Sequence, residues 1–325
     1  MNRASLLEKM PVAITAVVLI TMTVAAGLHF PNFLTLRVLT NLLADNAFLG
    51  VVAVGLTFVI LTGGIDLSVG SMVGLSSIAV AKLMAGGHMH PLLAMAVPIV
   101  GGAVLGASQG FLIAKYKLPP FLVTLAGLFL CRGIALKISL ESLQIDHPFF
   151  NVLTGWSFAL PGKAALTAPA VSLIVVVAFG IWLARQTAYG RAVYAIGGNQ
   201  PSARLMGLPV DRTLIVTYGI SGLCAALGGV LFAVYTSSGN AISGTGLELD
   251  AIAAVVIGGT LLSGGYGSVV GTLLGIGILG VVQTAITFQG TLSSWWTKIV
   301  IGILLLVFML IQRTIESVAR RAQNA

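Results

Sequence analysis

Residues 46–85 read NAFLGVVAVGLTFVILTGGIDLSVGSMVGLSSIAVAKLMA and contain only two charged side chains, Asp66 and Lys82. Two apolar runs, 46–62 and 67–85, flank the pair Gly63-Gly64. A bilayer core about 30 Å thick takes roughly 20 apolar residues to cross as a helix, because hydrocarbon offers no partner for a free backbone N–H or C=O. The stretch therefore predicts two neighbouring membrane-spanning helices joined by a sharp glycine turn.

The same composition extends along the whole chain of 325 residues. Hydrophobic residues make up 57% of it and charged residues 8%, and the mean hydropathy is +1.04. Soluble domains carry about 25% charged residues, and disorder needs low hydrophobicity, so both classes are excluded. We expect an all-α polytopic membrane protein with about ten transmembrane helices. The expected spans lie near 11–29, 46–62, 67–85, 92–114, 119–137, 168–184, 213–236, 248–262, 268–288 and 295–312, the third and eighth being the weakest.

The net charge of +8 is interpreted as a signal of membrane topology. Eleven of the 17 basic residues fall on the inner side if both chain ends are cytoplasmic, which agrees with the positive-inside rule. These eleven are Arg3, Lys9, Lys115, Lys117, Arg185, Arg191, Arg204, Arg212, Arg313, Arg320 and Arg321. Because they are spread over several short segments, they predict contact with membrane lipid and no nucleic-acid partner. A cleaved secretory signal over 1–27 is the alternative to a retained first span.

Two loops are long enough to have a function of their own. The outer loop, 138–167, is expected to pack as a small cap. The inner loop, 185–212, contains a helix signature, with Asn199 as N-cap, Pro201 in the first turn and Gly207 at the stop. This short helix carries Leu205 and Met206 and is expected to dock a partner, the alternative being an interfacial helix that rests on the lipid.

Residues 63–70, GGIDLSVG, resemble residues 258–265, GGTLLSGG, at their Gly, Gly, Leu, Ser and Gly positions. Both segments fall at an expected inner turn, as duplicated halves of a transporter can. Glycine pairs permit broken helices at membrane depth, where they survive only against protein or a water-filled path. The candidates for a translocation path or hinge are Gly63, Gly64, Asp66, Ser68, Gly258, Gly259 and Ser263. A chance match between glycine-rich turns and a helix-capping role for Asp66 are the alternatives.

Several activities lack the residues that they need. Cys131 and Cys224 have no second Cys or His at ligand spacing, so no metal site is expected, and Gly162-Lys163 is not a phosphate-binding loop. The scarcity of carboxylates within the spans argues against an ion-coupled secondary carrier. That carrier, a passive facilitator and a non-transporting assembly subunit all stay open as alternatives at this point. Glycines at four-residue spacing, Gly102, Gly106 and Gly110 among them, predict closely packed helices.

The chain resembles, over nearly its whole length, the permease subunits of bacterial ribose/galactose-type ABC sugar importers. The resemblance rests on 43–47 and 59–71, and on 194–199 with 203–207, which are similar to that family's cytoplasmic coupling loop. The stretches 246–252 and 290–299 are closer to the second permease of the galactofuranose importer. Pro201 departs from the pattern, where a small or acidic residue is expected.

The resemblance implies a single permease domain over 1–325 with a type II-like importer bundle, in the bacterial inner membrane. It also implies partners: an ABC ATPase that binds ATP and Mg²⁺, a periplasmic sugar-binding protein, and a second permease. The second permease would form a heterodimer, with a homodimer as the alternative. No cofactor would bind this chain, which would perform no chemistry. The residues implied in coupling to the ATPase are Gly198, Asn199, Ala203, Arg204, Leu205, Met206 and Gly207.

Overall fold

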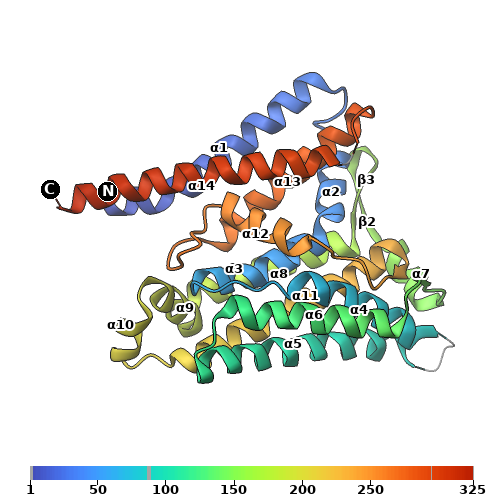
Figure 1. The fold of residues 1–325 in the computed structure, drawn as a ribbon. Helices are drawn as coiled ribbons and strands as arrows, with labels where there is room; N and C mark the ends of the chain where they lie inside the picture. Colours follow the sequence, from blue (N-terminus) through green and yellow to red (C-terminus); the bar gives the residue numbers. More distant parts are fainter. Residues whose placement is uncertain (1–2, 86–88, 294, 325) are drawn as a thin grey trace.

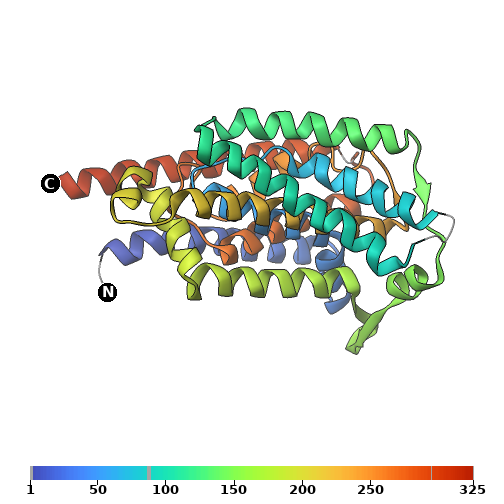
Figure 2. The same ribbon diagram turned by 90° about the horizontal axis from the view of Figure 1, so that it is seen from below.

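The computed structural model describes residues 3–85, 89–293 and 295–324. Ser294, which belongs to one of the stretches quoted above, lies outside the described residues, as do the side chains of Arg3, Lys9, Arg320 and Arg321. Long helices run side by side along one common direction (Figures 1 and 2). The all-α polytopic fold class expected from the composition is confirmed.

Among the described residues, seven helices are long and apolar enough to cross a membrane. They are α1 (Arg3–His29), α5 (Pro91–Tyr116), α6 (Pro120–Ile138), α8 (Ala168–Gln186), α11 (Val210–Thr236), α13 (Val269–Gln289) and α14 (Trp295–Asn324). A further pair is long and apolar enough only when its two helices are taken together: α2 (Leu36–Asp45) and α3 (Ala47–Leu61) meet at Asn46 with a bend of 59°, which gives an eighth crossing if the pair is one span.

The third and eighth expected spans are shorter than the sequence suggests. The third is α4 (Val69–Met84), and the eighth is α12 (Leu247–Ile257) with 11 residues. At 1.5 Å per residue, α12 is only about 16 Å long, so it crosses part of a bilayer. The helix stops because Gly258 and Gly259 follow, and Gly259 has a φ of +90°. The two weak spans are therefore partial helices, continued by the non-helical segments 62–68 and 258–268.

Helix α11 lies at the centre of the bundle and packs along α5, α3 and α4. The expected close packing of glycines occurs here, because a Cβ on Gly106 would lie 2.1 Å from the Tyr218 carbonyl oxygen of α11. A Cβ on Gly222 would lie equally close to the Gly102 carbonyl oxygen. Small residues thus let α5 and α11 approach backbone to backbone.

One end of the bundle carries the loop predicted as a cap (Figure 1). It contains β1 (Leu143–Gln144), α7 (Pro148–Gly155), β2 (Ser157–Leu160), the 3-10 turn η2 (Pro161–Lys163) and β3 (Ala164–Thr167). Strand β1 pairs with β4 (Ser238–Gly239) beyond α11, β2 pairs with β3, and Phe150 of α7 is fully buried. The loop is therefore anchored to the bundle through α11.

The opposite end carries α9 (Ala188–Gly198) and α10 (Gln200–Leu205). The start of α1 and the end of α14 lie at this same end (Figure 1). We call the two ends the α7 end and the α10 end.

Candidate coupling and translocation site

Helix α10 is fixed at both of its ends by local hydrogen bonds. The Asn199 side-chain oxygen accepts from the Ser202 N–H at 2.8 Å, which is the N-cap expected from the sequence, and Pro201 lies in the first turn. At the other end the Leu208 N–H donates to the Ala203 carbonyl at 3.1 Å. Gly207 adopts a φ of +78°, which a residue with a Cβ rarely takes. Asn199 therefore caps the start of α10, and Gly207 lets the chain turn away after its end.

The side chains of α10 divide between two surroundings. Ala203 is fully buried in a small cluster with Ile196 and Leu214, and so faces the bundle. Leu205 and Met206 are 89% and 69% exposed. Large apolar side chains that no part of the described chain covers, on a capped helix, form a surface suited to a partner.

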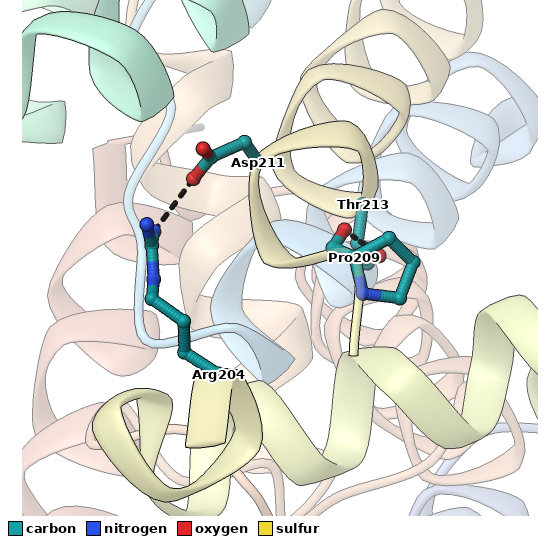
Figure 3. Close-up of polar contacts among 4 residues, drawn as sticks. All are labelled: Arg204, Pro209, Asp211 and Thr213. Carbon is teal, nitrogen blue, oxygen red and sulfur yellow. Dashed lines mark hydrogen bonds and ion pairs between the residues drawn. The ribbon is translucent and has the colours of Figure 1, made fainter. Parts of the chain in front are cut away.

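Arg204 connects α10 to the start of α11 (Figure 3). Its guanidinium lies 2.6 Å from an Asp211 carboxylate oxygen, and both side chains are about half exposed. Nearby, the Thr213 hydroxyl donates to the Pro209 carbonyl at 2.9 Å, within the first turn of α11 (Figure 3). An exposed ion pair adds little stability, so this one mainly orients α10 relative to α11.

Glycines from three separate segments meet where α9 ends, and we call this set the glycine junction: Gly63, Gly197, Gly198, Gly264 and Gly265. The Gly265 N–H donates to the Leu61 carbonyl at 2.9 Å. A Cβ on Gly197 would lie 1.8 Å from that same carbonyl oxygen, and one on Gly264 would lie 2.7 Å from the Gly63 nitrogen. The two similar turns and the end of α9 thus touch through bare backbone.

A tyrosine hydrogen bond reinforces the glycine junction. The Tyr194 hydroxyl of α9 donates to the Gly267 carbonyl at 2.9 Å. Burial raises the pKa of the Tyr194 phenol, so the group keeps its proton at neutral pH and remains a donor. Sequence reasoning missed Tyr194, Gly197, Gly264 and Gly265 as site residues, although the Gly197-Gly198 and Gly264-Gly265 pairs were visible signals.

Asp66 lies inside the bundle, although an inner turn was expected for it, because the segment 62–68 turns back before the shortened α4 begins. The carboxylate is fully buried. One oxygen accepts from the Ser68 N–H at 2.9 Å and from the Ser68 hydroxyl at 2.6 Å, and the other accepts from the Ser221 hydroxyl at 2.7 Å. Asp66 therefore closes a turn just before α4 and ties that turn to α11.

The remaining candidates lie elsewhere. A Cβ on Gly258 would meet the Gly271 carbonyl oxygen of α13 at 2.4 Å, and one on Gly259 would meet Pro11 of α1 at 2.9 Å. The Ser263 carbonyl, by contrast, lies near Gly63 at the glycine junction. A Cβ on Gly64 would lie 2.4 Å from the Tyr218 hydroxyl, which is buried without a hydrogen-bond partner in the described structure. The candidates therefore fall into three groups. Gly63 and Ser263 lie at the glycine junction, Asp66 and Ser68 form a buried cluster with Ser221, and Gly258 packs against α13.

Among the described residues, no group of three or more His, Cys, Asp or Glu side chains is placed so that it could hold a metal ion. Cys131 and Cys224 are both buried and unpaired with each other.

Residues 38–309 match the family model described as branched-chain amino acid transport system / permease component. The inner membrane ABC transporter permease protein YjfF of Escherichia coli (strain K12) is 48% identical over 98% of this chain and 96% of its own length. The fructose import permease protein FruG of Bifidobacterium longum (strain NCC 2705) is 37% identical, over 96% and 93%. The ribose import permease protein RbsC of Bacillus subtilis (strain 168) is 40% identical, over 87% of each chain. No solved structure matches the chain.

Proposed function

The chain belongs to the family of branched-chain amino acid transport system permease components, and from that premise we propose that it is the membrane-spanning subunit of an ATP-driven monosaccharide importer. It performs no chemistry. The observation that carries the proposal is the capped helix α10, whose exposed Leu205 and Met206 offer a docking surface while its buried Ala203 anchors it to the bundle.

In this proposal, α10 transmits the conformational change of the ATPase to the helix bundle. A partner ABC ATPase binds ATP and Mg²⁺, closes, and pushes on α10. Helix α9 precedes α10 directly and ends at the glycine junction, so the movement reaches both glycine turns. ATP then drives transport because it binds one conformation of the whole assembly more tightly than the other.

The proposed substrate is galactofuranose or a related monosaccharide. The family description names branched-chain amino acids, whereas FruG and RbsC are named for fructose and ribose import. Sugar import is favoured because these relatives match almost the whole chain, and galactofuranose because 246–252 and 290–299 resemble the second permease of that importer.

The proposed assembly places the α10 end in the cytoplasm and the α7 end outside, with both chain termini cytoplasmic. A periplasmic sugar-binding protein delivers the solute at the α7 end. A second permease completes the membrane core, as a heterodimer with a sister chain, and a homodimer is the alternative.

Reconstitution tests this proposal. The chain is purified together with a candidate ATPase, sugar-binding protein and second permease, placed in proteoliposomes, and assayed for uptake of labelled galactofuranose, ribose, fructose and leucine. We expect accumulation of a sugar that requires ATP and the binding protein. Accumulation by the chain alone under a sodium or proton gradient, equilibration without ATP, or ATP-driven uptake of leucine alone would contradict it. Omitting the second permease separates the heterodimer from the homodimer.

A further inference from the structure

A cavity of about 530 Å³ lies toward the α7 end of the bundle, between the α2–α3 break, α12, α13 and the start of α14. Asn46 stands at the break, at the opposite end of the 15-residue α3 from Leu61 and the glycine junction. That separation is about 21 Å along the helix axis. The cavity volume lies within the range of small-molecule sites, which is about 300–1,000 Å³. It exists because one span is bent here and α12 begins only at Leu247.

The cavity wall is polar for a membrane protein. Asp45, Asn46, Asp250, Gln283 and Lys298 line it, together with apolar residues that include Phe48. The Lys298 ammonium lies 2.5 Å from an Asp250 carboxylate oxygen, and Asp45 accepts from the Tyr235 hydroxyl at 3.0 Å. Such groups are costly in hydrocarbon, and broken helices at membrane depth occur where they border protein or a water-filled cavity.

The polar and charged groups that line the cavity indicate which class of ligand it can bind. Carboxylates, side-chain amides and one ammonium group offer both acceptors and donors, which a polyhydroxylated ring needs, and apolar residues such as Phe48 and Leu279 line the same cavity. The two carboxylates outnumber the single ammonium, which is already paired with Asp250. An anion such as a sugar phosphate, a sugar acid or the carboxylate of an amino acid is therefore disfavoured.

Both stretches that are closest to the galactofuranose permease contribute to this one cavity. Leu247 and Asp250 come from 246–252, and Thr297 and Lys298 come from 290–299. Segments about 45 residues apart in the sequence are brought together at the same wall by the packing of α12 against α14.

We propose that this cavity is a binding site for the neutral monosaccharide, occupied between release from the binding protein and passage toward the α10 end. The proposal rests on the proposed function and adds the residues that hold the solute. Gln283 is its most informative residue, because it is an uncharged, exposed side chain of α13 that lines the cavity.

The test compares two glutamines of the same helix in the reconstituted importer. Gln283→Leu removes a donor and an acceptor from the cavity, whereas Gln289→Leu makes the same change at an exposed position that does not line it. We expect Gln283→Leu to lower ATP-driven sugar uptake by roughly fivefold, about the value of one hydrogen bond to the solute. ATP hydrolysis stimulated by the loaded binding protein should persist in both variants, Gln289→Leu should transport normally, and Gln283→Asn should restore part of the uptake.

A labelling experiment gives a second measurement that does not depend on transport by a damaged variant. Gln283→Cys and Gln289→Cys are treated with a membrane-impermeant maleimide, with and without the transported sugar at high concentration. The native Cys131 and Cys224 are buried and give little background. We expect the sugar to slow labelling at position 283 only, and a sugar that is not transported to slow neither.

The outcomes separate the two proposals. If the wild-type complex takes up no sugar, the proposed function fails and the cavity site fails with it. If the wild type transports sugar, but Gln283→Leu matches Gln289→Leu and the sugar protects neither cysteine, the proposed function stands and the cavity site is overturned.

Discussion

At the scale of single residues, a substitution at Leu205 distinguishes an effect on docking of the ATPase from an effect on protein stability. It is 89% exposed, so Leu205→Asp should change the free energy of unfolding by no more than about 0.5 kcal/mol. We expect ATP-driven uptake to be lost nevertheless, because a charge replaces the apolar surface offered to the ATPase. The matched control is Leu140→Asp at the α7 end, where the leucine is 76% exposed, and it should retain uptake. Normal uptake by Leu205→Asp, at wild-type membrane levels, would remove the docking role of α10.

Arg204 and Gly207 test the same helix in a different way. Reversing the charge with Arg204→Glu places two carboxylates together beside α10, and Gly207→Pro forbids the positive φ that ends the helix. Both variants should insert into the membrane at normal levels, because α10 is not one of the helices long and apolar enough to cross it, and both should abolish uptake in cells. Insertion is followed by membrane fractionation and uptake with labelled sugar.

Asp66 is expected to hold the turn before α4. Asp66→Ala leaves the Ser68 N–H and the Ser221 hydroxyl buried without their acceptor, at about 1–3 kcal/mol for each unsatisfied group, whereas the Ser68 hydroxyl keeps the Gln109 side-chain oxygen as an acceptor. The melting temperature of the purified chain in detergent should therefore fall further than in Ser221→Ala. A thiol-reactive dye can report unfolding, since both native cysteines are buried. An unchanged melting temperature with lost uptake would instead place the carboxylate in the transport path.

At the scale of elements, two adjacent glycines of α9 provide a matched pair. A Cβ on Gly197 would overlap the Leu61 carbonyl oxygen, whereas one on Gly198 would meet no atom within 4 Å. Gly197→Ala should force α9 away from the turn after α3, with a destabilisation of about 1–3 kcal/mol and a large loss of uptake. Gly198→Ala should be tolerated. Equal uptake by the two variants would mean that the glycine junction does not transmit movement.

At the scale of the whole molecule, the orientation of the bundle in the membrane can be tested by replacing each of two exposed serines with cysteine and labelling the thiol. Ser202 belongs to α10, and Ser142 directly precedes β1 in the loop that contains α7. Helices α10 and α7 lie at opposite ends of the bundle (Figure 1). In intact cells, an impermeant thiol reagent should label Ser142→Cys and leave Ser202→Cys unlabelled until the membrane is opened. The reverse pattern would contradict cytoplasmic termini, because α1 begins and α14 ends at the same end of the bundle as α10 (Figure 1).

Local sequence signals were enough to predict the fold class, the approximate positions of ten apolar segments, and the caps of α10 at Asn199 and Gly207. These signals are apolar run length and the residues that begin or end a helix. The number of spans was overestimated, because seven described helices are long enough to cross a membrane, or eight crossings exist if the bent α2–α3 pair forms one span. The sequence did not show that α4 and α12 are partial helices, that Asp66 is buried, or that the polar cavity exists. These features depend on the packing of the whole chain, because a broken helix, a buried carboxylate and a polar wall are stable in a membrane only when distant segments supply their partners. Ser221 reaches Asp66 from α11, Leu61 meets Gly265 across the two glycine turns, and Asp250 meets Lys298 between α12 and α14.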